Sequence, residues 1–347
     1  MKIIPLNPPF SKGEKRYPPL EKGGKDGDLK GYFRMKLIVQ IPCLNEEATL
    51  PEAIKAIPRK IAGIESVEIL VIDDGSSDRT SQVARECGAD HVVRFKVNQG
   101  LARGFIAGLL TAVSLGADII VNTDADNQYN GDDIPKLIQP ILNGKADVVV
   151  GDREVETIRH FSASKKVLQK LGSWVVRIAS DTHIPDAASG FRAYSREDAL
   201  RTNIVSGYTY TLESIIQAGH NKLAITHIPV RTNQVLRESR LISSVRSYLV
   251  RSASTIIRTY AMYRPLIFFF TIGLVVFLGG LVVAIRYIFY MLRGEGAGHI
   301  QSLILAATLM MLGFQTIVIG LISDLIAANR RLGEEAVYRL RKMDKEV

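Results

Sequence analysis

Cysteine is scarce in this chain, so the sites that depend on it are excluded. Only Cys43 and Cys87 occur in 347 residues, and they do not form a CxxC pair. A disulfide framework and a zinc knuckle are therefore excluded. Each of the two thiols is predicted to be buried rather than to act as a nucleophile.

Several common catalytic patterns are missing as well. None of the six histidines stands in HExxH, and no GxxxxGK[ST] occurs, which excludes that metalloprotease pattern and the P-loop enzymes. The glycines of GLARGFIAG, at 100, 104 and 108, are four residues apart and predict a smooth helix face rather than a GxGxxG loop.

Long basic runs with interleaved aromatic residues are also absent, which argues against nucleic acid as a partner. The net charge is nevertheless +9. Many basic residues lie between 231 and 264 and after 329, on both sides of apolar segments. This placement favours an anionic membrane surface or a lipid phosphate.

Residues 1–34 have no apolar run, so we do not expect them to be a signal peptide. They are rich in proline, glycine and lysine and show no periodicity, which predicts a disordered extension. The phrase MKLIVQIP begins cleanly at Met35. We expect that Met35 is the true start or that the extension is dispensable.

Apolar strands alternate with helical stretches from residue 36 onward. Strands are predicted at 36–42, 67–74, 89–96, 117–126 and 146–153, and helices at 46–57, 76–88, 100–116 and 132–144. Near-continuous valine and isoleucine runs between helices indicate an α/β fold, Rossmann-like, with a mostly parallel sheet over 35–235. Ligands of such sheets bind beyond the carboxyl ends of the strands, where the acidic pairs of this sequence fall.

Two uncharged apolar segments, 266–285 and 301–323, are each long enough to span a bilayer. The short loop between them predicts a transmembrane helical hairpin over 265–328; a buried core hairpin is the alternative. Residues 236–264 read as amphipathic interface helices, or else as a plain surface helix, and 329–347 as a basic tail. The positive-inside rule places both ends of the hairpin, and the catalytic domain, in the cytoplasm.

The stretch NTDADNQY crowds Asp124 and Asp126 at the end of a buried strand. Two like charges this close need a positive partner or hydrogen bonds between them. A calcium loop is excluded because Leu137 stands where the EF-hand spacing requires a bidentate Glu. A hard divalent ion, completed by phosphate oxygens, a substrate cation and helix-cap bonds remain open, and the ion is favoured.

A second acidic pair, Asp73 and Asp74, ends the strand VEILVIDD. The following GSSDRT can be explained by a turn and a helix cap. That explanation does not account for two carboxylates at the end of a buried strand. Carboxylates there can accept hydrogen bonds from a base or a ribose.

In this order and spacing, the motifs IPCLNEEATL, VIDDGSSDRT, NQGLARGFIAG, TDADNQY, VGDRE, SGFRAYSRE and IPVRTNQVLRESRL resemble the family 2 glycosyltransferases of the GT-A fold. The resemblance covers about residues 36 to 264. Within the family it is greatest to the dolichyl-phosphate mannosyltransferases and polyprenyl-phosphate glycosyltransferases. The QxxRW of processive polysaccharide synthases is missing, because the single Trp174 stands in QKLGSW.

The resemblance assigns roles to individual residues. It implies that Asp124, Asp126 and Gln128 bind Mg²⁺ or Mn²⁺, and that Asp126 and Arg153 are catalytic. It also implies a donor and acceptor site that contains Pro42, Leu44, Asn45, Glu46, Asp73, Asp74, Arg103, Asp124, Ala125, Lys165, Gln169, Arg192, Arg237 and Arg240. Of these, the residues from Pro42 to Glu46 would line the base and ribose, Asp73 would hold the base, and Asp74 the neighbouring sugar. Arg103 would lie near the phosphates. The lipid phosphate would be drawn in by Arg192, Arg237 and Arg240. Lys165 and Gln169 stand where the family has an acceptor-binding Arg and Ser.

The function implied is transfer of one sugar from a nucleotide sugar (GDP-mannose or UDP-glucose type) to a polyprenyl phosphate, with inversion at the anomeric carbon. A membrane enzyme of the inner (cytoplasmic) membrane is expected, a homo-oligomer is possible, and cell-envelope assembly would use the product. The alternatives are another lipid or lipid-linked glycan acceptor, and a non-catalytic nucleotide-sugar-binding partner of a membrane protein.

Overall fold

The computed structural model describes residues 35–154, 182, 184–204, 210–233, 254, 257–258 and 260–346. The expected disorder of 1–34 and most of the expected amphipathic segment 236–264 lie outside the described residues. Four predicted site residues, Lys165, Gln169, Arg237 and Arg240, lie outside them too.

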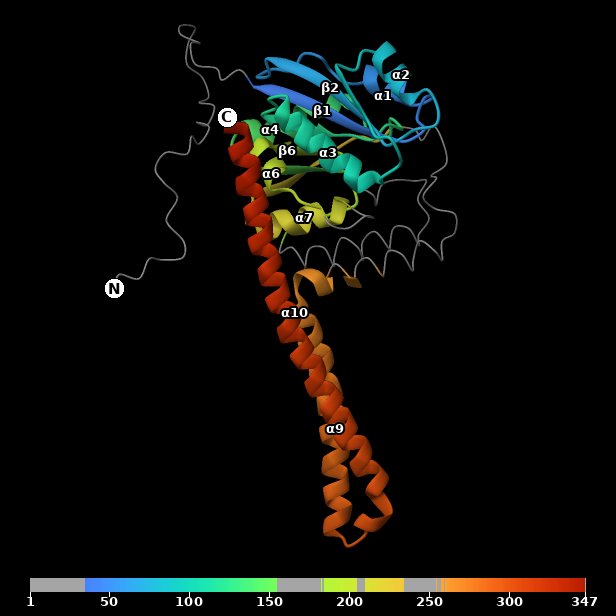
Figure 1. The fold of residues 1–347 in the computed structure, drawn as a ribbon, viewed down its shortest axis with the longest axis vertical. Coiled ribbons are helices and arrows are strands. Elements are labelled where there is room, and N and C mark those ends of the chain that lie inside the picture. Colours follow the sequence, from blue (N-terminus) through green and yellow to red (C-terminus); the bar gives the residue numbers. More distant parts are fainter. Residues whose placement is uncertain are drawn as a thin grey trace, which may run out of the picture.

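A seven-stranded sheet forms the centre of the domain, with the order β3-β2-β1-β4-β6-β5-β7 (Figure 1). The strands are β1 Lys36–Cys43, β2 Ser66–Asp73, β3 His91–Arg94, β4 Ile119–Asn122, β5 Val148–Asp152, β6 Arg192–Ser195 and β7 Ile225–Pro229. All pairings are parallel except the two made by β6, which lies antiparallel between β4 and β5. The predicted mostly parallel α/β sheet is confirmed.

Helices cover both faces of the sheet, as the apolar strands require. The bounds are α1 Leu50–Lys55, α2 Thr80–Glu86, α3 Leu101–Ser114, η1 Gly131–Asp133, α4 Ile134–Leu142, α6 Arg196–Arg201 and α7 Tyr210–His220. One core cluster joins the sheet to α1, α2 and α4, and a second joins it to α3, α6 and α7. The strands are thus apolar on both sides, and polar chemistry is left to their ends.

Two predicted features differ from the structure. The helix expected over 46–57 begins only at Leu50, because residues 44–48 form the turn that follows β1. Strands β6 and β7 were not predicted. β6 has only four residues, and both strands follow segments without the strong strand–helix alternation of the first half.

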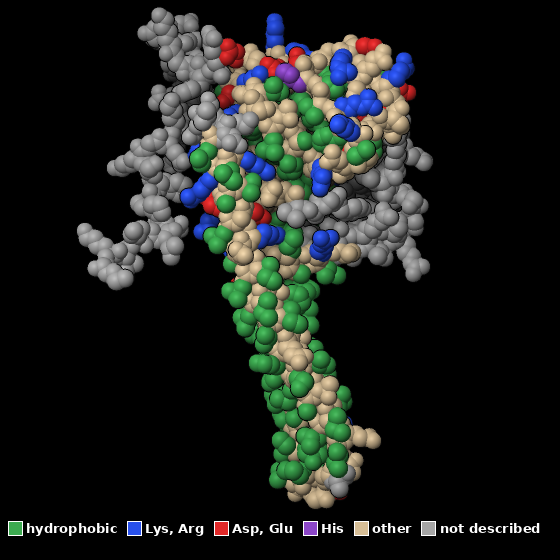
Figure 2. Space-filling view, viewed as in Figure 1, with side chains coloured by type: hydrophobic (Ala, Val, Ile, Leu, Met, Phe, Trp, Pro, Cys, Tyr) green, Lys and Arg blue, Asp and Glu red, His purple; other side chains and the backbone are tan. Residues whose placement is uncertain are grey.

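The two apolar segments form the paired helices α9 Pro265–Leu292 and α10 Ile300–Glu346. Both are long and apolar enough to cross a membrane. In the most apolar 18-residue stretch of each helix, only 11% of α9 and 17% of α10 is buried. A core hairpin would be covered by protein, so that alternative does not fit. Figure 2 shows hydrophobic side chains on the visible surface of this stalk, and lysine and arginine side chains around its junction with the domain.

Small residues allow α9 and α10 to pack closely. A Cβ at Gly313 would lie 2.6 Å from the Phe277 nitrogen, and a Cβ at Gly280 would lie 2.8 Å from the Met310 nitrogen. Backbone contact through glycine is the usual way in which membrane helices associate tightly.

Helix α10 does not end at the predicted span. The segment interpreted as a basic tail, 329–347, continues the same helix to Glu346 and packs against α6. The Tyr338 hydroxyl donates to Glu197 (2.5 Å), and Arg341 donates to the carbonyl oxygens of Leu200 and Thr202 (3.1 and 2.9 Å). The C-terminus is therefore fixed to the domain (Figure 1).

Asp198 of α6 makes the stability of this domain depend on pH. Burial raises its pKa to about 7, although the Thr202 hydroxyl donates a hydrogen bond to it. The pKa of Asp198 in the folded protein is above its unfolded value of about 4. Its contribution to the free energy of unfolding is therefore fully present below pH 4 and is lost as pH rises through 7.

Asp198→Asn should therefore flatten the pH dependence of thermal unfolding. Between pH 4 and 8 the Tm of the wild type should fall relative to that of the variant. The corresponding loss in the free energy of unfolding is about 4 kcal/mol for a shift of three pKa units. Parallel Tm curves for the two proteins over this range would contradict the prediction.

Candidate functional site

The predicted site residues that the structure describes lie along one edge of the sheet. The carboxyl ends of β1 and β2 are adjacent, with Cys43 paired to Asp73, and β4 ends beside β1, with Asn122 paired to Gln40. β6 is antiparallel, so its first residue, Arg192, falls at this same edge. We call this edge the catalytic rim.

The acidic pair after β4 is held by Gln128. The Gln128 side-chain nitrogen donates to Asp124 Oδ2 (2.6 Å), and its backbone nitrogen donates to Asp126 Oδ1 (3.2 Å). Burial and the nearby Asp126 charge raise the pKa of Asp124 to about 6, against the lowering effect of the Gln128 hydrogen bond. The hydrogen bonds of Gln128 therefore only partly offset the repulsion between the two carboxylates.

A buried polar network fixes the loop that carries this pair. Asn122 accepts a hydrogen bond from Gln40 (2.8 Å) and donates to the Gly190 carbonyl (2.8 Å) and the Tyr210 hydroxyl (3.1 Å). A Cβ at Gly190 would lie 2.9 Å from Asp124 Oδ1, so only glycine fits beside the carboxylate. These residues were missed by sequence reasoning; an Asn and a Gln at matching places in two buried strands were the available signal.

Tyr129 adds a second support below the loop. Its hydroxyl accepts a hydrogen bond from the Gly190 nitrogen (3.0 Å), and its ring stacks on Phe191 with 5.1 Å between centroids. Asn127, which has φ +55°, is held by Asn233, whose amide donates to the carbonyls of Asn127 and Tyr129. The acidic loop is therefore tied to the segments around β6 and after β7.

Arg153 follows β5 and forms a buried ion pair that the sequence did not reveal. Its Nε and Nη2 donate to the two oxygens of Asp186 (2.7 and 3.0 Å). Only 10% of the Arg153 side chain and 3% of the Asp186 side chain is exposed. The nearby Tyr129, Asp186 and Asp124 raise the pKa of Arg153, against the effect of burial, so it is a permanent cation close to the acidic pair.

The pair Asp73 and Asp74 shapes the backbone beyond β2. Asp73 is fully buried and accepts hydrogen bonds from the Ser76 nitrogen (2.8 Å) and the Ser81 hydroxyl. Asp74 accepts from the nitrogens of Gln99 (2.7 Å) and Gly100 (2.9 Å). Both carboxylates thus hold turns at the rim, a role that was not expected from the sequence.

Residues after β1 form the neighbouring part of the rim. Asn45 has φ +54°, and its side-chain oxygen accepts from the Ser77 nitrogen (2.8 Å). Glu46 is buried and accepts from the Thr49 hydroxyl (2.6 Å). Leu44 is exposed, and Arg103 is an exposed residue of the first turn of α3, where it donates to Gln99 (3.1 Å).

Arg192 requires a correction. It was expected to draw in a lipid phosphate, but its side chain has no exposed surface. Its guanidinium donates to the carbonyls of Ala187, Ser189 and Thr211 and to the Ser214 hydroxyl. Because these contacts use four of its five N–H donors inside the protein, Arg192 positions the 187–192 segment.

Cys43 fits the predicted buried thiol. Only 3% of its surface is exposed, and it lies among carboxylates of the rim. Burial raises its pKa well above the ordinary value, and the charges of Glu46, Asp73, Asp78 and Asp124 raise it further. Burial and the raised pKa both disfavour the thiolate form. Cys87 is only partly buried.

The donor set of the acidic pair fits a hard divalent ion that binds together with a phosphate ligand. No cluster of three His, Cys, Asp or Glu side chains that could hold a metal occurs within the described ranges. The protein would supply carboxylate oxygens of Asp124 and Asp126 and the amide oxygen of Gln128. Mg²⁺ and Mn²⁺ accept such partial oxygen shells and complete them with phosphate oxygens.

Comparison with known proteins agrees with this geometry. Residues 38–201 match the family model "Glycosyl transferase family 2". The chain is 31% identical over 216 residues to the UDP-N-acetylglucosamine–dolichyl-phosphate N-acetylglucosaminyltransferase of Methanococcus voltae, which covers 55% of this chain and 83% of that protein. It is 28% identical over 236 residues to the polyprenol monophosphomannose synthase of Mycolicibacterium smegmatis, covering 64% and 88% respectively.

The fold is shared with a solved structure. Glucosyl-3-phosphoglycerate synthase of Mycobacterium tuberculosis, in complex with Mn²⁺, UDP-glucose and phosphoglyceric acid, superposes with a TM-score of 0.51 at 22% identity. The similarity covers 64% of this chain and 79% of that one. At this level of identity the similarity shows a common fold alone.

Proposed function

This chain belongs to glycosyl transferase family 2, and from that premise we propose that it transfers one sugar from a nucleotide sugar to a polyprenyl phosphate at the membrane surface. The donor would be of the GDP-mannose or UDP-glucose type, and the anomeric carbon would be inverted. The observation that carries the proposal is the rim itself, where an acidic pair lies near a buried, permanently charged arginine on a domain joined to an apolar hairpin.

The proposed donor site follows the rim from β1 to β4. Pro42, Leu44, Asn45 and Glu46 would line the base and ribose with Asp73 and Asp74. Several of these groups already hold the rim turns internally, so they would present a pre-shaped wall. Arg103, exposed on the first turn of α3, would meet the diphosphate, which suits a guanidinium because its planar fork binds two oxygens.

The proposed reaction needs charge stabilisation more than proton transfer. Negative charge develops on the departing nucleoside diphosphate, and a divalent ion at Asp124, Asp126 and Gln128 would supply electrostatic stabilisation of it. Arg153 lies at the same rim, and its cationic state is fixed by Asp186. Ala125, buried between the two carboxylates, would form part of the floor under the sugar.

The proposed acceptor needs little help from a general base. A phosphate monoester is largely ionised near neutral pH, since its second pKa is about 6, and it can attack without losing a proton to the enzyme. Relatives named for dolichyl and polyprenol phosphate support this acceptor class. Lys165, Gln169, Arg237 and Arg240 remain proposed contacts of the lipid phosphate.

The proposed organisation follows the residue boundaries predicted from the sequence. The domain 35–235 would lie on the cytoplasmic face, 236–264 at the membrane interface, and the hairpin within the bilayer of the inner membrane. Basic residues on both sides of the hairpin support this orientation through the positive-inside rule.

The first experiment is a transfer assay with the full chain in detergent. Undecaprenyl or dolichyl phosphate would be mixed with a panel of labelled nucleotide sugars, with Mg²⁺, with Mn²⁺ and with chelator. Metal-dependent label in the lipid phase from one donor is expected, and the same lipid without its phosphate should accept nothing. Label on the phosphate-free lipid would favour another lipid acceptor, and nucleotide binding without any transfer would favour a binding partner.

A further inference from the structure

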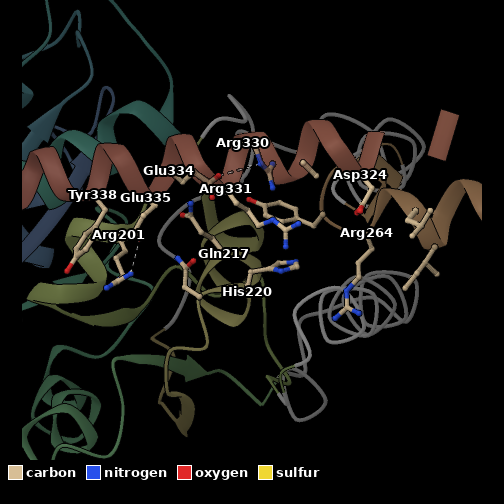
Figure 3. A pocket seen from close by; sticks show the side chains of 15 residues that line it. Arg201, Gln217, His220, Arg264, Asp324, Arg330, Arg331, Glu334, Glu335 and Tyr338 are labelled. Atoms are coloured by element: carbon tan, nitrogen blue, oxygen red, sulfur yellow. Dashed lines mark ion pairs between the residues drawn. The ribbon is translucent and has the colours of Figure 1, made fainter. Parts of the chain in front are cut away.

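A cavity of about 460 Å³ lies at the base of the hairpin, away from the acidic pair. It is bounded by the end of α7, by Tyr263 and Arg264 just before α9, and by residues 324–338 of α10. We call it the hairpin-base cavity. Figure 3 shows side chains of α7 and α10 facing each other across it.

The cavity is lined by buried nitrogen donors that are not satisfied. Arg330 Nε and Nη1 and Arg264 Nε are buried and have no hydrogen-bond partner in the described part of the chain, and the same holds for His220 Nε2, which donates in one of its two neutral tautomers. Buried donors without acceptors are unfavourable, and the single unsatisfied oxygen of Glu334, 3.5 Å from Arg330 Nε, is too few for all of them, so their concentration at one cavity indicates a missing acceptor. A phosphate group offers several acceptor oxygens at once.

One of the cavity arginines, Arg330, is held in place before any ligand binds. The Arg330 guanidinium lies 4.3 Å from the centroid of the Tyr263 ring, and that ring stacks on His220 with 5.4 Å between centroids. Arg330 Nε is 3.5 Å from Glu334 Oε1, an ion pair in which neither atom has a hydrogen-bond partner among the described residues. Aromatic stacking thus fixes the guanidinium while its donors stay available.

The charged side chains that line the cavity carry a small net positive charge. The lining has four arginines against three carboxylates. Of the carboxylates, Glu335 accepts from Arg339 (2.9 Å) and also pairs with Arg201 (3.7 Å). The pKa of His220 is lowered by burial and then by the charges of Arg264, Arg331 and Arg330. Burial first, and then the arginine charges, therefore favour the neutral form of His220.

The position of the cavity separates it from the proposed reaction. Helix α7 begins at the rim, where Tyr210 bonds to Asn122, and ends in the cavity at His220, about 15 Å along the helix axis. The cavity also lies where the apolar run of α9 begins, at Leu266 and Ile267. That is the depth at which lipid headgroups meet a membrane helix.

We propose that the hairpin-base cavity is a second anion site that binds a phosphate group, supplied by the headgroup of an anionic membrane lipid or by free phosphate. The ligand would satisfy the donors of Arg330, Arg264 and His220 and would join α7 to α10. Its effect is on the fixing of the hairpin to the domain, so the inference does not depend on the proposed transfer reaction.

The test measures thermal unfolding of the full chain in detergent with added phosphatidylglycerol, phosphatidylcholine or inorganic phosphate. Phosphatidylglycerol is expected to raise the Tm by about 3–8 °C over phosphatidylcholine. The variant Arg330→Gln/Arg331→Gln should lose more than half of this rise. The charge-matched control Lys55→Gln/Lys60→Gln, which changes two exposed lysines on and after α1, should keep it.

Arg264→Gln alone tests the site if the double variant does not fold, because Arg264 supplies another of the unsatisfied donors. A rise in Tm with phosphatidylglycerol alone identifies a lipid headgroup as the ligand. An equal rise in Tm with inorganic phosphate, lost in the cavity variants, identifies free phosphate. Equal rises with both lipids, or a full response in the cavity variants, would overturn the proposal.

Discussion

Asp126→Ala is expected to lower the rate of sugar transfer by about 100- to 1,000-fold without loss of the fold. Its carboxylate is one of the two that would hold the divalent ion. Loss of electrostatic stabilisation of the leaving group typically lowers an enzymatic rate by this much. Removing the carboxylate also relieves the repulsion on Asp124, so the Tm should stay unchanged or rise slightly. Mn²⁺ binding, measured by titration calorimetry in the presence of the nucleotide, should weaken in parallel with the rate.

Asp132→Ala provides the matched control. Asp132 is an exposed carboxylate of the same loop region, in the first turn of η1, and its side chain is not part of the acidic pair. This variant should retain wild-type transfer and Mn²⁺ binding. Full activity of Asp126→Ala would refute the proposed metal role of the pair.

Arg153→Met is expected to be the most destabilising single change at the rim. It would leave the Asp186 carboxylate, which is 3% exposed, buried without its bidentate partner. Breaking one side of a buried ion pair costs about 3–5 kcal/mol. For a domain of this size that is a fall in Tm of about 6–20 °C, measurable by differential scanning fluorimetry in detergent.

The double variant Arg153→Met/Asp186→Asn separates stability from catalysis. With the buried charge neutralised, most of the lost Tm should return, because an unpaired buried charge rather than the pair itself causes the loss. Transfer activity should stay low if Arg153 supplies positive charge to the phosphates. Recovery of activity together with Tm would show that Arg153 serves only to hold Asp186.

The positions of the site residues along the chain were readable because their strands are strongly apolar. Each of the runs that end at Asp73, Asn122 and Asp152 is a buried strand bounded by polar residues, so the sequence predicts both the strand and the polar loop after it. Parallel neighbours then bring these ends to one edge without any further information. The family resemblance supplied the expected roles, which the geometry does not itself test.

The partners of the site residues could not be read in the same way. Asp186 lies 33 residues after Arg153, and Gln40 lies 82 residues before Asn122. Nothing local in the chain marks these pairs, because each forms only when the strand order is known. Insertion of the antiparallel β6 between β4 and β5 creates the contacts of Gly190 and Arg192, and its four residues carry too little pattern to be recognised.

The continuous helix α10 has a mechanical consequence for an enzyme that works on lipids. Residues 300–346 contain no proline, and the last turns are fastened to α6 through Tyr338 and Arg341. This helix, about 70 Å from end to end, runs without a break from the apolar hairpin to the contacts with the domain. Any tilt of the hairpin, such as one imposed by a thinner membrane, would turn the whole domain and change the angle at which the rim meets its substrate.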